Sequence, residues 1–124
     1  MTLVEQRIYT YLAATSGITD LVSTRLFPHF LEQACEMPAL SFFRVSTVPV
    51  NDLGGYADVE QPRIQFDCWG STDDSSKALA KALLDAMEAA TTFNALYLSW
   101  TSSYEAETKL YREQLDFQCW NETD

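Results

Sequence analysis

A change of hydrophobic period within residues 62–90 constrains the possible folds of this sequence most strongly. In its first part, PRIQFDCWG, apolar and polar side chains alternate, which is typical of a β-strand with one buried face. In its second part, apolar residues recur at spacings of three and four, which is typical of one face of an α-helix. We expect Gly70 to end the strand, and Ser71 and Asp74 to cap the helix. The predicted inward residues are Ile64, Phe66 and Cys68 on the strand, and Leu79, Ala82, Leu83, Ala86, Met87 and Ala90 on the helix.

The whole sequence predicts one α+β domain. Its length suits one domain and is too short for two, so we assign residues 1–124 to a single domain. A first helix is predicted from a capping box of Thr2 and Glu5 until Gly17. Alternating or short apolar runs predict further strands at residues 25–28, 39–47, 94–102 and 109–120. On one face of the strand at 94–102 we expect Leu96, Leu98 and Trp100.

The composition argues against several classes of protein. The apolar runs are too short to cross a bilayer and residues 1–15 do not resemble a signal peptide, so we expect no membrane partner. Three distant cysteines without a C-x-x-C pair argue against a disulfide framework and a zinc site. A net charge of −10 argues against specific nucleic-acid binding, which needs clustered Lys and Arg. Either solubility or a surface that does not adhere to passing DNA explains this charge.

Residues 48–61 are polar and rich in turn-forming residues, and they predict a flexible loop or arm within the domain. The segment is long for a hairpin loop, and two interpretations stay open: a mobile connection, or an arm that orders against a neighbouring molecule. Under the second interpretation, the candidate contact residues are Pro49, Asn51, Asp52, Leu53, Gly54, Gly55 and Tyr56.

Two similar pentapeptides, QFDCW and DFQCW, end in Trp69 and Trp120. We interpret them as neighbouring strands of one sheet, with both tryptophans on the face opposite Phe66 and Phe117. If they are exposed, Trp69 and Trp120 are candidate interface anchors. The alternative is that they pack beneath a loop at the ends of their strands.

No motif in the sequence indicates catalysis, a metal or a cofactor. His29 is the one histidine and has aromatic neighbours, which favours a packed ring over a ligand or a base. Asp67 and Asp116 are the candidate acids of an enzyme, but Arg63 and Arg112 beside them favour cross-strand salt bridges. We therefore predict no catalytic, cofactor-binding or metal-binding residue.

The order of these segments resembles the tail-completion or tail-terminator family of long-tailed bacteriophages. The resemblance covers nearly the whole chain, and a Gly-containing polar loop separates its second and third motifs. The motifs are RLFP at residues 25–28, PALSF at 38–42, RIQFDCW at 63–69, STDDSSKALA at 71–80 and REQLDFQCW at 112–120.

The resemblance implies helices packed on one face of a mostly antiparallel sheet. It implies a structural virion protein, made in the host cytoplasm, that forms a homo-hexameric ring at the head-proximal end of the tail tube. The ring ends tube polymerisation and enables head–tail joining, so the expected partners are further copies, the tail tube protein and the head connector or neck protein. DNA passes through such a ring, and the family's loop that orders on assembly corresponds to residues 48–61.

Other functions remain as alternatives. A head-completion (neck) protein or a minor tail protein has the same features of sequence. The gene can belong to a virus, a prophage or a tail-like particle. A small enzyme of unknown activity has the least support, because no histidine partner, metal cluster or glycine-rich site accompanies the acids.

Overall fold

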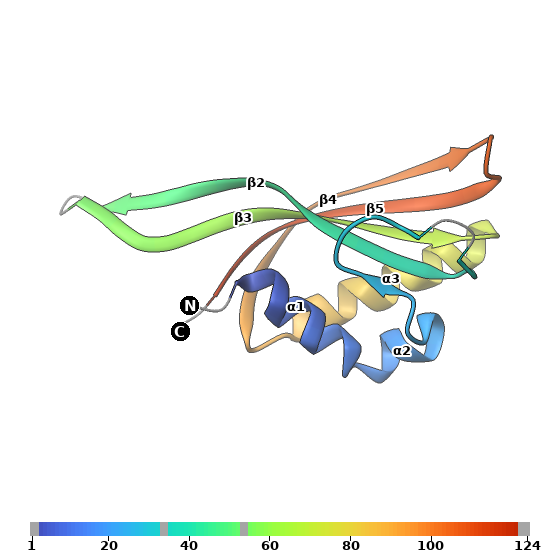
Figure 1. Ribbon diagram of the computed structural model, residues 1–124, viewed down its shortest axis with the longest axis horizontal. Helices are drawn as coiled ribbons and strands as arrows, with labels where there is room; N and C mark the ends of the chain where they lie inside the picture. Colours follow the sequence, from blue (N-terminus) through green and yellow to red (C-terminus); the bar gives the residue numbers. More distant parts are fainter. Residues whose placement is uncertain (1–2, 33–34, 53–54, 122–124) are drawn as a thin grey trace.

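Helices cover one face of a sheet in this protein, and the other face of the sheet carries no helix (Figure 1). The computed structural model describes residues 3–32, 35–52 and 55–121, which form three helices and five strands. None of the described helices is long and apolar enough to cross a membrane. The elements are α1 (Val4–Ala13), α2 (Ser16–Val22), β1 (Leu26–Phe27), β2 (Ala39–Asp52), β3 (Gly55–Gly70), α3 (Asp73–Ala89), β4 (Phe93–Glu105) and β5 (Leu110–Asn121).

The strand order across the sheet is β1-β2-β3-β5-β4. Only the pairing of the two-residue β1 with β2 is parallel among the described strands, and the other three pairings are antiparallel. The predicted α+β fold, with a mostly antiparallel sheet and helices on one face, is therefore confirmed. The short strand expected at residues 25–28 lies at the sheet edge, where proline ends it.

The predicted strand–turn–helix unit is confirmed, with a different cap. Thr72, one residue after the expected Ser71, is the N-cap, and its Oγ1 accepts a hydrogen bond from the Ser75 backbone N–H at 3.1 Å. Ser75 Oγ in turn lies 3.3 Å from the Thr72 nitrogen, which completes a capping box. A Cβ at Gly70 would lie 2.4 Å from Ser75 Oγ and 2.7 Å from the Ser76 nitrogen, so only glycine fits this turn.

The core lies between the sheet and α3. Ile64, Phe66 and Cys68 of β3 are completely buried, as the alternation predicted. Three phenylalanines connect adjacent strands across this layer: the ring centroids of Phe42 and Phe66 are 5.4 Å apart, and those of Phe66 and Phe117 are 5.5 Å apart. The buried residues of α3 are Ser76, Leu79, Ala80, Leu83, Ala86 and Met87.

The predicted N-terminal helix ends before Gly17, and a second helix follows where the sequence offers one more helical turn, at residues 18–22. Gly17 was expected to end it, but α1 ends at Ala13 and Gly17 lies in the first turn of α2. The break occurs at Thr15, whose backbone is extended (φ −92°, ψ 112°) and whose carbonyl oxygen accepts from the amides of Ile18 and Thr19. Burial of Ile18 and of Val22 then holds α2 on the core.

The start of α1 also differs from the prediction. Thr2, the expected cap, lies outside the described residues, and Leu3 occupies the N-cap, where its amide donates to Gln6 Oε1 at 3.1 Å. Glu5 instead binds the Arg44 guanidinium of β2, with an Oε1–Nη2 distance of 2.5 Å. This pair connects α1 to the sheet.

Residues 47–52 pair with residues 55–62 as a hairpin that we call the arm. Its backbone is paired as two antiparallel strands, so the loop expected at residues 48–61 continues β2 and β3 instead, and its flexibility stays a prediction. Pairing of β3 with β5 begins at Arg63, directly after Pro62, which has no N–H to donate to the next strand. The arm therefore leaves the sheet as a two-stranded ribbon and extends far from the helices (Figure 1).

Candidate functional site

Four charged side chains form two ion pairs on the face of the sheet opposite the helices. Arg63 Nη2 lies 2.5 Å from Asp116 Oδ2, and Arg112 Nε lies 4.0 Å from Asp67 Oδ1. The predicted cross-strand salt bridges are therefore confirmed. Ser99 Oγ of β4 also donates to Asp116 Oδ2 at 3.4 Å, so the polar contacts connect β3, β5 and β4.

The two carboxylates are buried although no helix covers them. Asp67 and Asp116 are each only 5% exposed. Burial raises the pKa of Asp67, an effect that the nearby Arg112 guanidinium opposes. Asp116 Oδ1 and Arg112 Nε are buried and have no hydrogen-bond partner among the described residues. These two atoms therefore add to the cost of burying charge on this face.

The tryptophans of the two similar pentapeptides have different environments. Trp69 is 8% exposed, its indole N–H donates to Ser41 Oγ at 3.2 Å, and the Arg112 guanidinium lies 5.5 Å from its ring centre. The exposure required of an interface anchor is therefore absent at Trp69, and the interpretation as a packed aromatic holds there. Trp120, opposite Asn94 on the same face, is half-buried and stays a candidate contact residue.

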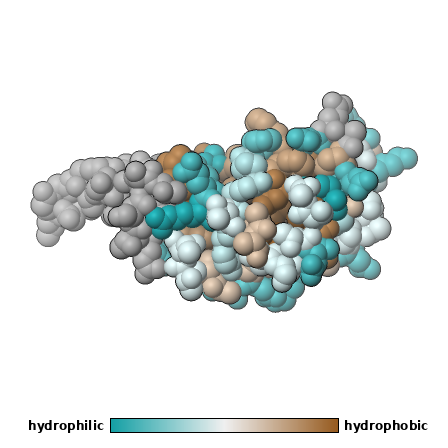
Figure 2. Space-filling model, turned by 60° about the horizontal axis from the view of Figure 1, so that its bottom comes forward, coloured by the Kyte–Doolittle hydropathy of each residue, from teal (hydrophilic) through white to brown (hydrophobic). Residues whose placement is uncertain are grey.

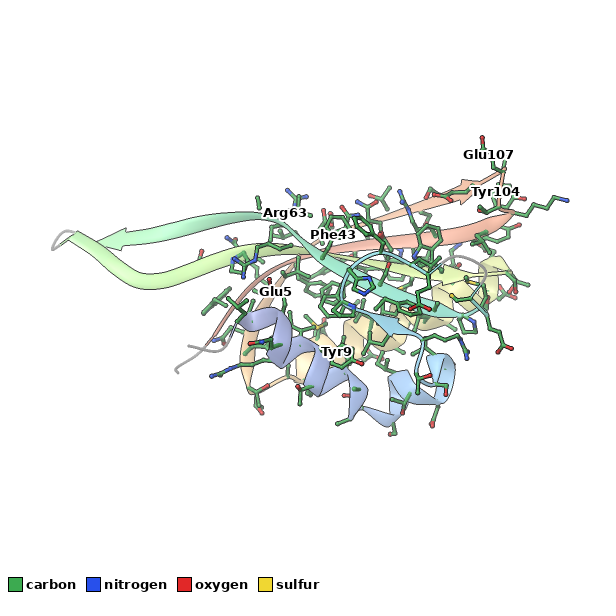
Figure 3. The ribbon with its side chains drawn as sticks, in the orientation of Figure 1. Glu5, Tyr9, Phe43, Arg63, Tyr104 and Glu107 are labelled. Carbon is green, nitrogen blue, oxygen red and sulfur yellow. The ribbon has the colours of Figure 1, made fainter. Side chains whose placement is uncertain are left out.

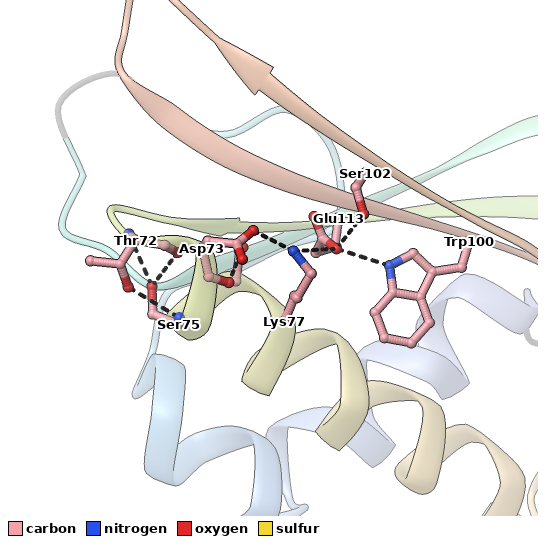
Figure 4. A network of polar contacts seen from close by, with 8 residues as sticks. Thr72, Asp73, Ser75, Lys77, Trp100, Ser102 and Glu113 are labelled. Carbon is pink, nitrogen blue, oxygen red and sulfur yellow. Dashed lines mark hydrogen bonds and ion pairs between the residues drawn. The ribbon is translucent and has the colours of Figure 1, made fainter.

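Glu113 is a buried carboxylate that the sequence analysis missed. It lies on the helical side of β5, is 1% exposed, and accepts hydrogen bonds from Ser102 Oγ at 2.6 Å and Trp100 Nε1 at 3.1 Å (Figure 4). Lys77 Nζ of α3 lies 3.9 Å away and also contacts Asp73. Side chains alternate along a strand, so residue 113 lies on the same face as the buried Leu115. This alternation is the sequence signal that could have identified Glu113 as an inward residue. The network connects β4, β5 and α3, and all of the carboxylate's contacts stabilise the fold.

His29 is exposed, so the packed ring expected from the sequence is limited to a contact with Phe27. Its ring centre lies 6.4 Å from that of Phe27, and its Nδ1 lies 3.0 Å from the Phe30 carbonyl oxygen. Among the residues that the structure describes, no group of three or more His, Cys, Asp and Glu side chains is arranged to hold a metal ion.

Among the residues whose burial the structure describes, the edge strand β4 carries the longest run of exposed large apolar side chains. Leu96, Tyr97 and Leu98 are 53%, 42% and 43% exposed. A register shift between Tyr97 and Ser99 places Leu98 in a bulge, so the predicted common face of Leu96, Leu98 and Trp100 is wrong. Figure 3 shows Tyr104, another exposed aromatic of β4, near Glu107 at the end of the β4–β5 hairpin.

The described residues of the three helices include no comparable run. Figure 2 shows the helical side as hydrophilic residues interspersed with small hydrophobic patches. An apolar-lined depression of about 420 Å³ lies between α1 and Thr92, and Arg7 at its edge donates to the Thr92 carbonyl oxygen at 2.9 Å. The three consecutive exposed apolar side chains of β4 therefore distinguish this edge of the sheet from the described helices.

Comparison with known proteins gives the family of this chain. The family described as "Tail completion protein gp17" matches residues 6–122. The chain belongs to the tail completion protein gp17 family. Membership confirms the resemblance found in the sequence, and it makes the chain a structural protein of the bacteriophage virion tail.

Structural comparison shows the same fold within a phage-like particle. A chain of the structure titled "Virion of native gene transfer agent (GTA) particle" aligns with a TM-score of 0.73. The alignment covers 97% of this tail completion protein and 95% of that chain, at 18% sequence identity. No curated protein matches the sequence.

Proposed function

We propose that this protein forms a ring at the head-proximal end of the tail tube, where it ends tube polymerisation and enables the head to join. The arm is the observation that carries this proposal beyond family membership. A two-stranded hairpin is marginally stable in water by itself, so a hairpin that leaves the sheet at Pro62 gains most from packing against another molecule.

The arm and Trp120 supply the proposed contacts. In this proposal the arm contacts a neighbouring copy, the tube or the neck. Leu53 and Gly54 lie outside the described residues, and the backbones of the others belong to paired strands. The proposed contact residues are Pro49, Asn51, Asp52, Leu53, Gly54, Gly55, Tyr56 and Trp120.

The charge of the chain is compatible with a ring through which DNA passes. Six copies of −10 carry −60, which repels phosphate at short range, while salt screens the repulsion beyond about 8–10 Å. We assign the protein no catalytic role, because Glu113 and Asp116 are engaged in contacts within the fold.

Electron microscopy of particles made with this gene disrupted tests the proposal. We expect overlong or ragged tails without heads, since nothing then stops tube growth. Tails of normal length lying beside filled heads would instead identify a head-completion role, which binding to isolated connectors in preference to tubes would support. Intact infectious particles would overturn both functions.

A further inference from the structure

We propose that the outer edge of β4 in one copy contacts the outer edge of β2 in the next copy, with Leu98 and Val45 at the centre of the contact. The inference rests on the proposed ring and names the surfaces that build it. In this contact, a second copy of this chain covers the exposed apolar run on β4.

The sheet has two unlike edges that the described residues leave unpaired. One is β4, which lies last in the strand order and pairs with β5 alone among the described strands. The other is β2 beyond Ser41, because β1 pairs with Leu40 and Ser41 and then ends. The two edges lie at opposite sides of the same sheet, so both are available in one copy at once.

Each edge carries a register shift next to the same row of the sheet. One row of paired residues crosses the four main strands, and because β2 and β4 run in opposite directions, the two shifts lie on opposite sides of that row. The residues in the two shifts are Val45 and Leu98, which are 48% and 43% exposed. The row consists of Arg44 of β2, Ile64 of β3, Phe117 of β5 and Tyr97 of β4.

The charge of the molecule favours β4 as a contact between copies. Each copy carries −10, so copies repel one another, and a contact costs least where the surface is uncharged. Residues 93–104 contain no Asp, Glu, Lys or Arg. Edge strands that avoid pairing commonly carry a lysine or a proline at such a bulge. At this bulge β4 instead carries leucine, which gains from being covered.

The use of unlike edges leads to a ring. A contact between two β4 edges would be isologous and would end at a dimer. A contact between β4 and β2 is heterologous, and each added copy leaves one free edge of each kind until the ring closes. This geometry provides the closed assembly that the proposed function requires.

Cross-linking in assembled particles tests this contact. The test variant carries Val45→Cys and Leu98→Cys on a Cys35→Ser background. It is supplied to particles that lack the native gene. The assembled particles are then treated with a short-spacer bismaleimide. Cys68 and Cys119 are buried, and burial raises the pKa of the Cys119 thiol to about 12, so both stay unreactive. We expect a ladder of covalent multimers that ends at the number of copies in the ring.

The single variants are the matched controls. Val45→Cys alone and Leu98→Cys alone should stay monomeric, because neither edge meets its own kind. Dimers from Leu98→Cys alone would overturn the proposal in favour of an isologous contact. A double variant that enters particles normally but yields no ladder would also overturn it, while the proposed function would stand.

A second pair of variants covers the case in which the double variant does not enter particles. Leu98→Lys should fold normally by circular dichroism but should no longer enter particles. Tyr9→Lys, at a 40% exposed position on α1, should enter them normally. Normal entry of Leu98→Lys would overturn the edge contact. If the proposed function is itself wrong, the result appears in the other experiment: disruption of the gene leaves tails of normal length with heads attached.

Discussion

Asp67 and Asp116 lie on the helix-free face of the sheet and are still almost completely buried. Long neighbouring side chains cover them, and each has an arginine within 4.0 Å. A buried ion pair gains little net stability, because removing the charges from water offsets their attraction. The raised pKa of Asp67 shows that the loss of hydration outweighs the pairing at this carboxylate.

Asp67→Asn therefore tests the ionisation of this carboxyl group. Because the pKa of Asp67 is raised above 3.8 in the folded chain, the folded state holds the proton more tightly than the unfolded state. The free energy of unfolding of the native protein then falls as pH rises from the unfolded to the folded pKa, and stays lowered above it. Urea unfolding should show Asp67→Asn gaining stability relative to the native chain between about pH 3 and about pH 7.

Asp20→Asn, at an exposed position on α2, controls for the change in net charge. It should show a smaller pH-dependent difference from the native chain than Asp67→Asn does. A relative gain for Asp67→Asn at low pH and not at high pH would contradict the assignment, because the pairing with Arg112 would then dominate.

At the scale of elements, the turn between β3 and α3 sets how the helix returns to the sheet. Gly70 ends the strand, and the Thr72–Ser75 capping box begins the helix two residues later. The chain has no room for a side chain in this turn, because the atoms nearest to Gly70 belong to the capping box and to the Ser76 backbone.

Gly70→Ala should lower the free energy of unfolding by about 1–3 kcal/mol, since its methyl group would overlap the Ser76 nitrogen. Gly17→Ala is the matched control, because a Cβ there has no atom within 4 Å and the residue lies in α2. That change should stabilise the protein by about 0.4–1 kcal/mol. Thermal or urea unfolding measures both variants, and equal effects would show that the turn is not tightly packed.

The arm is the other element with a separate role. Deletion of residues 51–56 should leave the body folded, because the core lies in the remaining strands and in the helices. The same deletion should weaken ring formation or docking on tubes. Thermal unfolding and sedimentation with isolated tail tubes measure the two effects. Unchanged docking at equal stability would show that the arm serves as a connection alone.

At the scale of the whole molecule, the negative charge opposes assembly while the sheet edges favour it. Repulsion between copies acts over about 30 Å at 0.01 M salt and over about 8 Å at 0.15 M salt. The proposed contact is uncharged along β4, so salt should act on the repulsion much more than on the contact itself.

Raising the salt concentration should therefore increase the fraction of protein in rings, as measured by sedimentation velocity at high protein concentration. Lys109→Glu, at an exposed position in the β4–β5 turn, makes each copy more negative and should steepen this dependence. Dissociation on adding salt would contradict the expectation and would indicate that ion pairs hold the ring together.

Local patterns in the sequence determined the fold class and much of the sheet. Alternation in residues 63–69 and 112–120 predicted the apolar side chains that face the core, and it paired Arg63 and Arg112 with the two acids. The change of period after Gly70 predicted α3. These predictions succeed because side-chain direction along a strand or a helix depends on the few neighbouring residues.

The tertiary structure decided which surfaces are covered. Residues 48–61 look like a loop locally, yet each half pairs with the other half into an arm. Trp69 is buried because Ser41 and Arg112 come from other strands, and Glu113 is tolerated inside because β4 brings donors to it. The bulge at Leu98 and the free edge of β4 depend on how β5 pairs. Each of these depends on residues distant in sequence, and local periodicity carries no information about such partners.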